Sequence, residues 1–170
     1  RRGLAYGTTL FPVLMAAFIS QKLRLAGTWR GAIDRLELSY DDRFLRRKLL
    51  RSVAGRSVLV DLAQTMSLGH GDALELAGGE LVEICAADEE LLAISGENLV
   101  QLAWHIGNRH TPCQIEPDRL LIQPDPVIGH MLAHLGASVT PTRQAFNPEG
   151  GAYGHGRTHA HAHGHTAHDH

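Results

Sequence analysis

No apolar residue larger than alanine follows Tyr153, although the 170-residue chain continues for seventeen more positions. Seven of its twelve histidines lie in this stretch, separated by Gly, Ala, Thr, Arg and Asp. A segment without large apolar side chains cannot build a hydrophobic core. We therefore expect residues 149–170 to form a flexible, disordered His-rich tail, and the folded part of the protein to lie before it.

The composition of this tail predicts metal binding. Neutral imidazole coordinates Ni²⁺, Cu²⁺, Zn²⁺ and Co²⁺ and is a poor ligand for Mg²⁺ or Ca²⁺. A flexible chain also lets several imidazoles surround one ion. An engineered affinity tag is the alternative, but here the histidines alternate with other residues. The predicted ligands in the tail are His155, His159, His161, His163, His165, His168 and His170.

The whole-chain composition excludes several classes of protein. A formal net charge of −2 excludes a globally basic nucleic-acid binder. The only cysteines, Cys85 and Cys113, do not form a CxxC motif, so we expect small buried core residues rather than a zinc ribbon or a disulfide framework. Neither of the two lysines follows a glycine, and a phosphate-binding loop is therefore absent.

Charge is divided unequally along the chain. Residues 1–60 carry 12 Lys plus Arg against 4 Asp plus Glu, and residues 61–170 carry 4 against 14. The densest basic run extends from Arg43 to Arg56 and suits an acidic partner or nucleic acid. Aromatic residues for base stacking are nearly absent from it, which favours a solvated or partner-facing sheet surface.

The amino terminus resembles a signal peptide, because Arg1 and Arg2 precede an apolar stretch from Leu10 to Ile19. This stretch is too short to span a bilayer as a helix, and no A-x-A-like cleavage site follows it. We expect residues 1–27 to be an extension that packs weakly or not at all, and the protein to be cytoplasmic with no membrane partner.

Residues 28–88 read as a small, mostly β domain. Strands are predicted at residues 32–38, 57–62 and 81–85, from alternation or from β-branched and apolar content. Glycine-containing turns lie at residues 69–72 and 78–79. The acidic run at residues 88–90 is expected to be a polar hinge.

In residues 89–148 the hydrophobic pattern switches between strand and helix periodicity, which predicts elements in the order βαββαβ. A strand at 91–94 precedes a helix with the apolar stripe of Leu99, Leu102 and Ile106, for which Ser95 or Gly96 is the expected amino-terminal cap and Gly107-Asn108 the left-handed end. Strands at 113–116 and 120–123 form a hairpin. A second helix opens at Asp125-Pro126, and a strand at 138–146 follows. The order predicts a ferredoxin-like domain and an α+β protein overall.

Five histidines lie outside the tail. His110 follows the end of the first helix, and in a two-fold dimer two copies of it could converge on one ion. His130 and His134 have the i, i+4 spacing that can clamp a metal, but no glutamate makes an HExxH motif. A metallohydrolase therefore lacks its general base, and we expect no enzyme activity. His105 and His70 are expected to be structural.

Two blocks of sequence carry a family resemblance. Residues 104–112 read WHIGNRHTP, and residues 146–154 read FNPEGGAYG before the His-rich end. In this order the blocks resemble UreE, the urease accessory nickel chaperone family, over residues 29–170. The first twenty or so residues stay outside the resemblance.

The resemblance implies a peptide-binding-like β domain, a ferredoxin-like metal-binding domain and a homodimer. It implies an interfacial nickel ligand at His110, completed by a tail histidine such as His155 or His159, and delivery of nickel to apo-urease through the GTPase UreG. Pro126 stands where family members often have histidine, so the resemblance does not extend to an accessory metal site at that position. The alternatives are a metal-responsive nucleic-acid regulator and a generic nickel or zinc storage protein.

Overall fold

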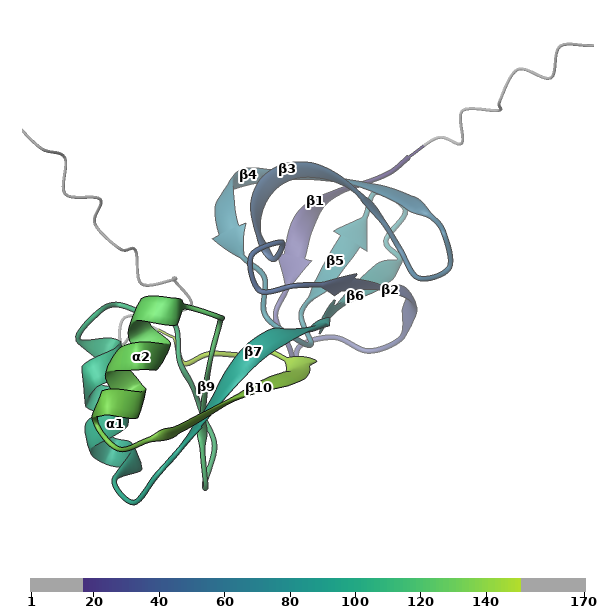
Figure 1. Ribbon diagram of the computed structural model, residues 1–170. Coiled ribbons are helices and arrows are strands. Elements are labelled where there is room, and N and C mark those ends of the chain that lie inside the picture. Colours follow the sequence, from purple (N-terminus) through teal and green to yellow (C-terminus); the bar gives the residue numbers. More distant parts are fainter. Residues whose placement is uncertain (1–16, 151–170) are drawn as a thin grey trace, which may run out of the picture.

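The computed structural model describes residues 17–150 (Figure 1), and the predicted tail beyond Gly150 lies outside the described residues. Within 17–150 the protein is mixed α+β, as expected, with ten strands and two helices. The strands form two sheets of six and four strands. The first sheet ends at residue 86 and the second begins at residue 88.

The first sheet has the strand order β2-β6-β5-β1-β4-β3. Alternate residues of its strands point inward, so that Val58, Val60 and Leu62 of β4 are all buried. The pairs β1–β4 and β2–β6 are parallel, and the other pairs are antiparallel. The strands are β1 (Phe18–Arg24), β2 (Ala32–Leu38), β3 (Phe44–Arg51), β4 (Ser57–Ser67), β5 (Ala73–Leu76) and β6 (Leu81–Ala86).

The prediction that residues 1–27 are an extension is wrong for β1. This strand lies inside the sheet, where Ile19 pairs with Leu59 of β4 and Leu23 pairs with Leu74 of β5. Both edges of β1 bond to strands that lie far along the sequence, so no local pattern marks it. Strands β3 and β5 were not expected either, since the basic run of β3 hides its alternation.

The second sheet is fully antiparallel, with the order β10-β7-β9-β8. Both helices cover the same face of it (Figure 1), where Ile94 and Ile122 of the sheet pack against Leu102, Ile106 and Leu132 of the helices. The order βαββαβ agrees with the prediction. The elements are β7 (Asp88–Ser95), α1 (Leu99–Gly107), β8 (Gln114–Ile115), β9 (Leu120–Ile122), α2 (Pro126–His134) and β10 (Ser138–Ala145).

Two local predictions in this half are wrong. The acidic run at residues 88–90 is not a hinge, because it forms the start of β7 and pairs with residues 143–145 of β10. The amino-terminal cap of α1 is Asn98 rather than Ser95 or Gly96. Its side-chain oxygen accepts a hydrogen bond from the backbone N–H of Gln101 at 3.1 Å, which satisfies a donor that the helix leaves free.

The other face of the second sheet joins the two halves of the protein. Phe146 is fully buried there among Leu91, Ala93 and Leu121, and its ring meets Tyr40 edge to face, with 5.3 Å between the ring centroids. The Arg43 side chain donates to the Phe146 carbonyl. The segment that leads to the tail is thus fixed between the sheets up to this point.

Candidate metal site

His110 occupies a strained backbone position at the end of α1. Its φ is +57°, the only positive φ of a non-glycine residue in the part of the chain that the structure describes. The N–H of His110 bonds to the Gly107 carbonyl at 2.9 Å, and the N–H of Thr111 bonds to the Ile106 carbonyl at 3.4 Å. This pair of bonds is the Schellman motif, whose left-handed residue is usually glycine.

Helix α2 ends in the same motif, but with glycine in the equivalent place. Gly136 has a φ of +87° and bonds to the Ala133 carbonyl at 3.0 Å, and the N–H of Ala137 bonds to the Leu132 carbonyl at 3.1 Å. Glycine adopts this conformation without strain, whereas a residue with a Cβ does so at a cost of about 1 kcal/mol. The cap of α1 therefore has a strained histidine where the cap of α2 has an unstrained glycine.

The sequence located the end of α1 correctly but not its left-handed residue. Asn108, expected to take this role, has a right-handed helical backbone with φ −64°. Its N–H still bonds to the carbonyls of Ile106 and Trp104. The left-handed turn therefore comes two residues later, at His110, whose side chain is exposed.

Helix α1 carries two large exposed apolar side chains on the side that faces away from the sheet. Val100 and Trp104 lie one turn apart, with exposed fractions of 82% and 62%. The buried stripe of Leu102 and Ile106 faces the sheet on the opposite side. Large apolar side chains in such a position are typical of a surface that another protein covers. His110 follows three residues after the end of α1.

The chain that leads to the tail passes beside the segment after His110. The N–H of Glu149 donates to the Cys113 carbonyl at 2.8 Å, and the N–H of Asn147 donates to the side-chain oxygen of Gln114 at 2.7 Å. Cys113 is only three residues from His110. The last described residues, up to Gly150, are thereby anchored close to the candidate ligand.

The two cysteines are partly buried rather than fully buried as expected. Burial, with a smaller contribution from the carboxylate of Glu149, raises the pKa of the Cys113 thiol to about 11. Burial is also the main cause that raises the pKa of the Cys85 thiol. Because a metal coordinates the thiolate, the raised pKa makes deprotonation on metal binding more costly at both cysteines.

The other histidines are dispersed. His105 is half-buried, with its ring edge to face with Trp104 at 5.1 Å between centroids. His70 lies in a turn, and its Nδ1 accepts the N–H of Ala86 at 3.2 Å, in agreement with a structural role. His130 and His134 are both exposed on α2. Among residues 17–150, no three His, Cys, Asp or Glu side chains are grouped closely enough to hold a metal ion.

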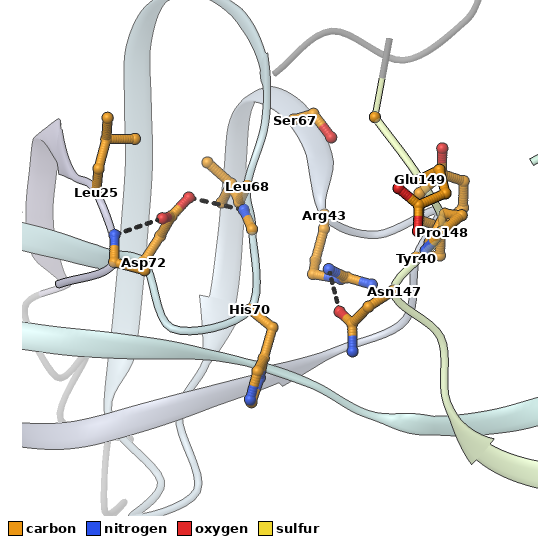
Figure 2. Close-up of a pocket in the computed structure, with 13 residues that line it drawn as sticks. Leu25, Tyr40, Arg43, Ser67, Leu68, His70, Asp72, Asn147, Pro148 and Glu149 are labelled. Atoms are coloured by element: carbon orange, nitrogen blue, oxygen red, sulfur yellow. Dashed lines mark hydrogen bonds between the residues drawn. The ribbon is translucent and has the colours of Figure 1, made fainter. Parts of the chain in front are cut away.

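A cleft of about 500 Å³ near Arg43 lies between the first half of the protein and residues 147–150 (Figure 2). Two of its charged side chains make hydrogen bonds within the protein. The Asp72 carboxylate accepts the N–H groups of Gly69 at 2.7 Å and Ala26 at 2.9 Å, and Arg43 donates to Asn147. Figure 2 shows the His70 ring and the Glu149 carboxylate in different parts of the cleft, so they do not converge.

The basic run of the sequence is centred on β3, an edge strand of the first sheet. Arg47 pairs with Asp61 at 3.7 Å, and Lys48 pairs with Asp42 at 2.8 Å. Arg46 and Arg51 are exposed on the same strand. Charged side chains on an edge strand discourage uncontrolled strand pairing. A partner for this surface stays a prediction.

Comparison with known proteins gives the family. The model of the amino-terminal domain of the UreE urease accessory protein matches residues 17–87, and the model of its carboxyl-terminal domain matches residues 89–170. The urease accessory protein UreE of Ruegeria pomeroyi is 61% identical over 137 residues, which cover 81% of this chain and 92% of that protein. UreE of Cereibacter sphaeroides is 55% identical over 140 residues, covering 82% and 76%.

The two matched domains, in this order and over nearly the whole chain, define a urease accessory protein. Such a protein serves the maturation of another enzyme and is not itself the enzyme. The chain belongs to the UreE family. The first family domain begins at residue 17, immediately before β1. In the described residues, neither helix has the length and apolar character that crossing a membrane requires.

Proposed function

We propose that this protein is a nickel metallochaperone, which binds Ni²⁺ in the cytoplasm and delivers it for assembly of the urease metal centre. The observation that carries the proposal is the placement of His110, an exposed imidazole on a strained, hydrogen-bonded helix cap. Strained residues persist where function requires their geometry. The antiparallel order β10-β7-β9-β8 supports a ferredoxin-like metal-binding domain, and the first sheet then corresponds to the peptide-binding-like domain.

The apolar face of α1 supports a homodimer. Burial of Val100 and Trp104 against a second copy would stabilise association, because both side chains are otherwise in contact with water. A two-fold axis beside the end of α1 would bring two copies of His110 together. Two imidazoles from different subunits form an open site that exchanges ligands, as a carrier requires.

The tail supplies the remaining ligands in this proposal. Glu149 is anchored beside Cys113, three residues from His110, a distance of at most about 11 Å along the chain. His155 lies six residues beyond Glu149, and six extended residues span at most about 20 Å. A tail histidine can therefore reach the same ion. The proposed tail ligands are His155, His159, His161, His163, His165, His168 and His170.

Delivery requires partner proteins, and the family assignment indicates which ones to test. We propose that a UreG-type GTPase accessory protein and the apo-urease complex receive the nickel. Zn²⁺, Cu²⁺ and Co²⁺ share the preference for imidazole, so they are expected to compete at the same ligands. A storage protein would bind the same ions without transferring them.

A calorimetric nickel titration tests the proposal. We expect the full chain to bind more than one Ni²⁺ per dimer, and a chain that ends at Gly154 to bind close to one with high affinity. In the shortened chain, His110→Ala should lower this affinity by at least about tenfold, since one imidazole per subunit is lost. The structural histidine His70 provides the matched control, His70→Ala, which should bind nickel unchanged.

Three results would oppose the proposal. Unchanged stoichiometry after removal of the tail would exclude its role in nickel storage, and unchanged affinity in the His110→Ala chain would exclude the interfacial site. Trp104→Arg should make the protein monomeric in analytical ultracentrifugation, with the helical circular dichroism retained. A dimer that survives this change would exclude α1 as its interface. Nickel transfer to apo-urease, measured as urease activity, separates a chaperone from a storage protein.

A further inference from the structure

A second pair of histidines lies on α2, away from the end of α1. His130 and His134 are four residues apart in a continuous helix that runs from Pro126 to His134. Residues with this spacing lie on one face, with Cβ atoms about 5–6 Å apart. Both histidines are exposed, whereas Ile128 and Leu132 on the same helix are buried against the sheet. The pair therefore projects into solvent.

Hydrogen bonds close both ends of α2, so the helical spacing between His130 and His134 is maintained. At the start, the Asp125 carboxylate accepts the N–H groups of Val127 at 2.9 Å and Ile128 at 3.0 Å. At the end, Gly136 and the residue after it close the last turn by the hydrogen bonds described above. His134, although the final residue of the helix, thus stays on a regular turn.

The surroundings favour a cation. Helix α2 contains no Lys, Arg, Asp or Glu, so no charged side chain on it repels a metal or occupies an imidazole. Neither ring makes a hydrogen bond to any residue within 17–150. The carboxyl end of a helix carries partial negative charge, which attracts a cation near His134.

We propose that His130 and His134 form a second metal site, which binds one borderline divalent ion such as Ni²⁺, Cu²⁺ or Zn²⁺ in each protomer. With metal–nitrogen distances of about 2.1 Å, two ring nitrogens about 3 Å apart can occupy adjacent positions on the ion. Water fills the other positions, so the site is open and weaker than one with more protein ligands. It requires neither the tail nor the dimer, and it stands independently of the proposed function.

Nickel binding to a chain that ends at Gly154 and carries His110→Ala tests this site. The tail and His110 cannot contribute there, and we expect weak binding of about one Ni²⁺ per protomer. His130→Gln or His134→Gln should each lower the affinity at least about tenfold, because the second imidazole acts at a high effective concentration. Ala133→Gln, an exposed change on the same helix, keeps both rings and should bind as before.

Two further measurements locate the ion. Ni²⁺ is paramagnetic in an open six-coordinate site, so amide signals of α2 should broaden selectively in the NMR spectrum. Ni²⁺ should also raise the melting temperature of the His110→Ala chain, but not that of its His130→Gln, His134→Gln derivative. Absence of binding in the starting chain would overturn the site, as would binding that both glutamine changes leave unaltered. Neither result bears on the interfacial site at His110, which the earlier titration tests separately.

Discussion

The Asp34 carboxylate connects β2 to the turn between β3 and β4. One oxygen accepts the N–H groups of Arg35 at 2.8 Å and Ala54 at 3.2 Å, and the other accepts the guanidinium of Arg56 at 2.8 Å. The Asp34 side chain is only 4% exposed. Burial by itself raises its pKa, but the hydrogen bonds from Ser52, Arg56 and the two N–H groups outweigh it and lower the pKa to about 2.

Asp34→Asn should destabilise the fold at neutral pH. Asparagine preserves the shape, but it removes the charge that strengthens these bonds and directs an NH₂ group at a donor. A hydrogen bond to a charged group contributes about 1.5–3 kcal/mol, so we expect a loss of about 2–3 kcal/mol in the free energy of unfolding. The folded-state pKa lies below its ordinary value of 3.8. The contribution is therefore complete above about pH 4 and is lost as the pH falls towards 2.

Urea unfolding followed by circular dichroism measures both effects. The difference between wild type and Asp34→Asn should be constant from pH 7 to pH 5 and decrease between about pH 4 and pH 2. Glu97→Gln, an exposed change in the second half, should show little difference at any pH. A difference for Asp34→Asn that stays the same down to pH 2 would refute the attribution to the charge. A difference below about 0.5 kcal/mol at pH 7 would refute the magnitude.

Two other changes test the packing and the caps by the same unfolding measurement. Phe146→Ala should lower the free energy of unfolding by about 3–5 kcal/mol, because the ring is fully buried where the two halves meet; a cost below 1 kcal/mol would show that the junction does not contribute to stability. His110→Gly should be about 1 kcal/mol more stable than His110→Ala, since glycine relieves the left-handed backbone; equal stabilities would contradict strain at this cap.

Elements with local signals could be predicted from the sequence. The apolar stripe of α1 and the Asp125-Pro126 start of α2 depend on residues within one or two turns, and the order βαββαβ follows from them. Strand β1 has no such signal, because its partners in β4 and β5 lie about 40–55 residues further along the chain. The predicted start of the first domain, at residue 28, therefore lies after β1 instead of before it.

The exposure of His110 was predictable from the sequence, but its backbone geometry was not. The position of His110 after a helix indicated an outward imidazole, yet its left-handed backbone depends on the hydrogen bonds of residues 106–111 as a group. Asn108 was the better local candidate, since asparagine tolerates that conformation. The anchoring of Glu149 beside Cys113 could not be read from sequence either, because 36 residues separate the two.

The two helix ends differ in the residue that takes the left-handed conformation. The same hydrogen-bonded cap closes α1 and α2, and only α2 has the glycine that this cap favours. A histidine in the glycine position of α1 costs about 1 kcal/mol of stability, and such strain is typical of functional positions. In the proposed function, metal binding by the imidazole offsets this cost. The pair on α2 lies in the helix itself, where histidine carries no such cost, and it can therefore add binding capacity while the glycine cap is retained.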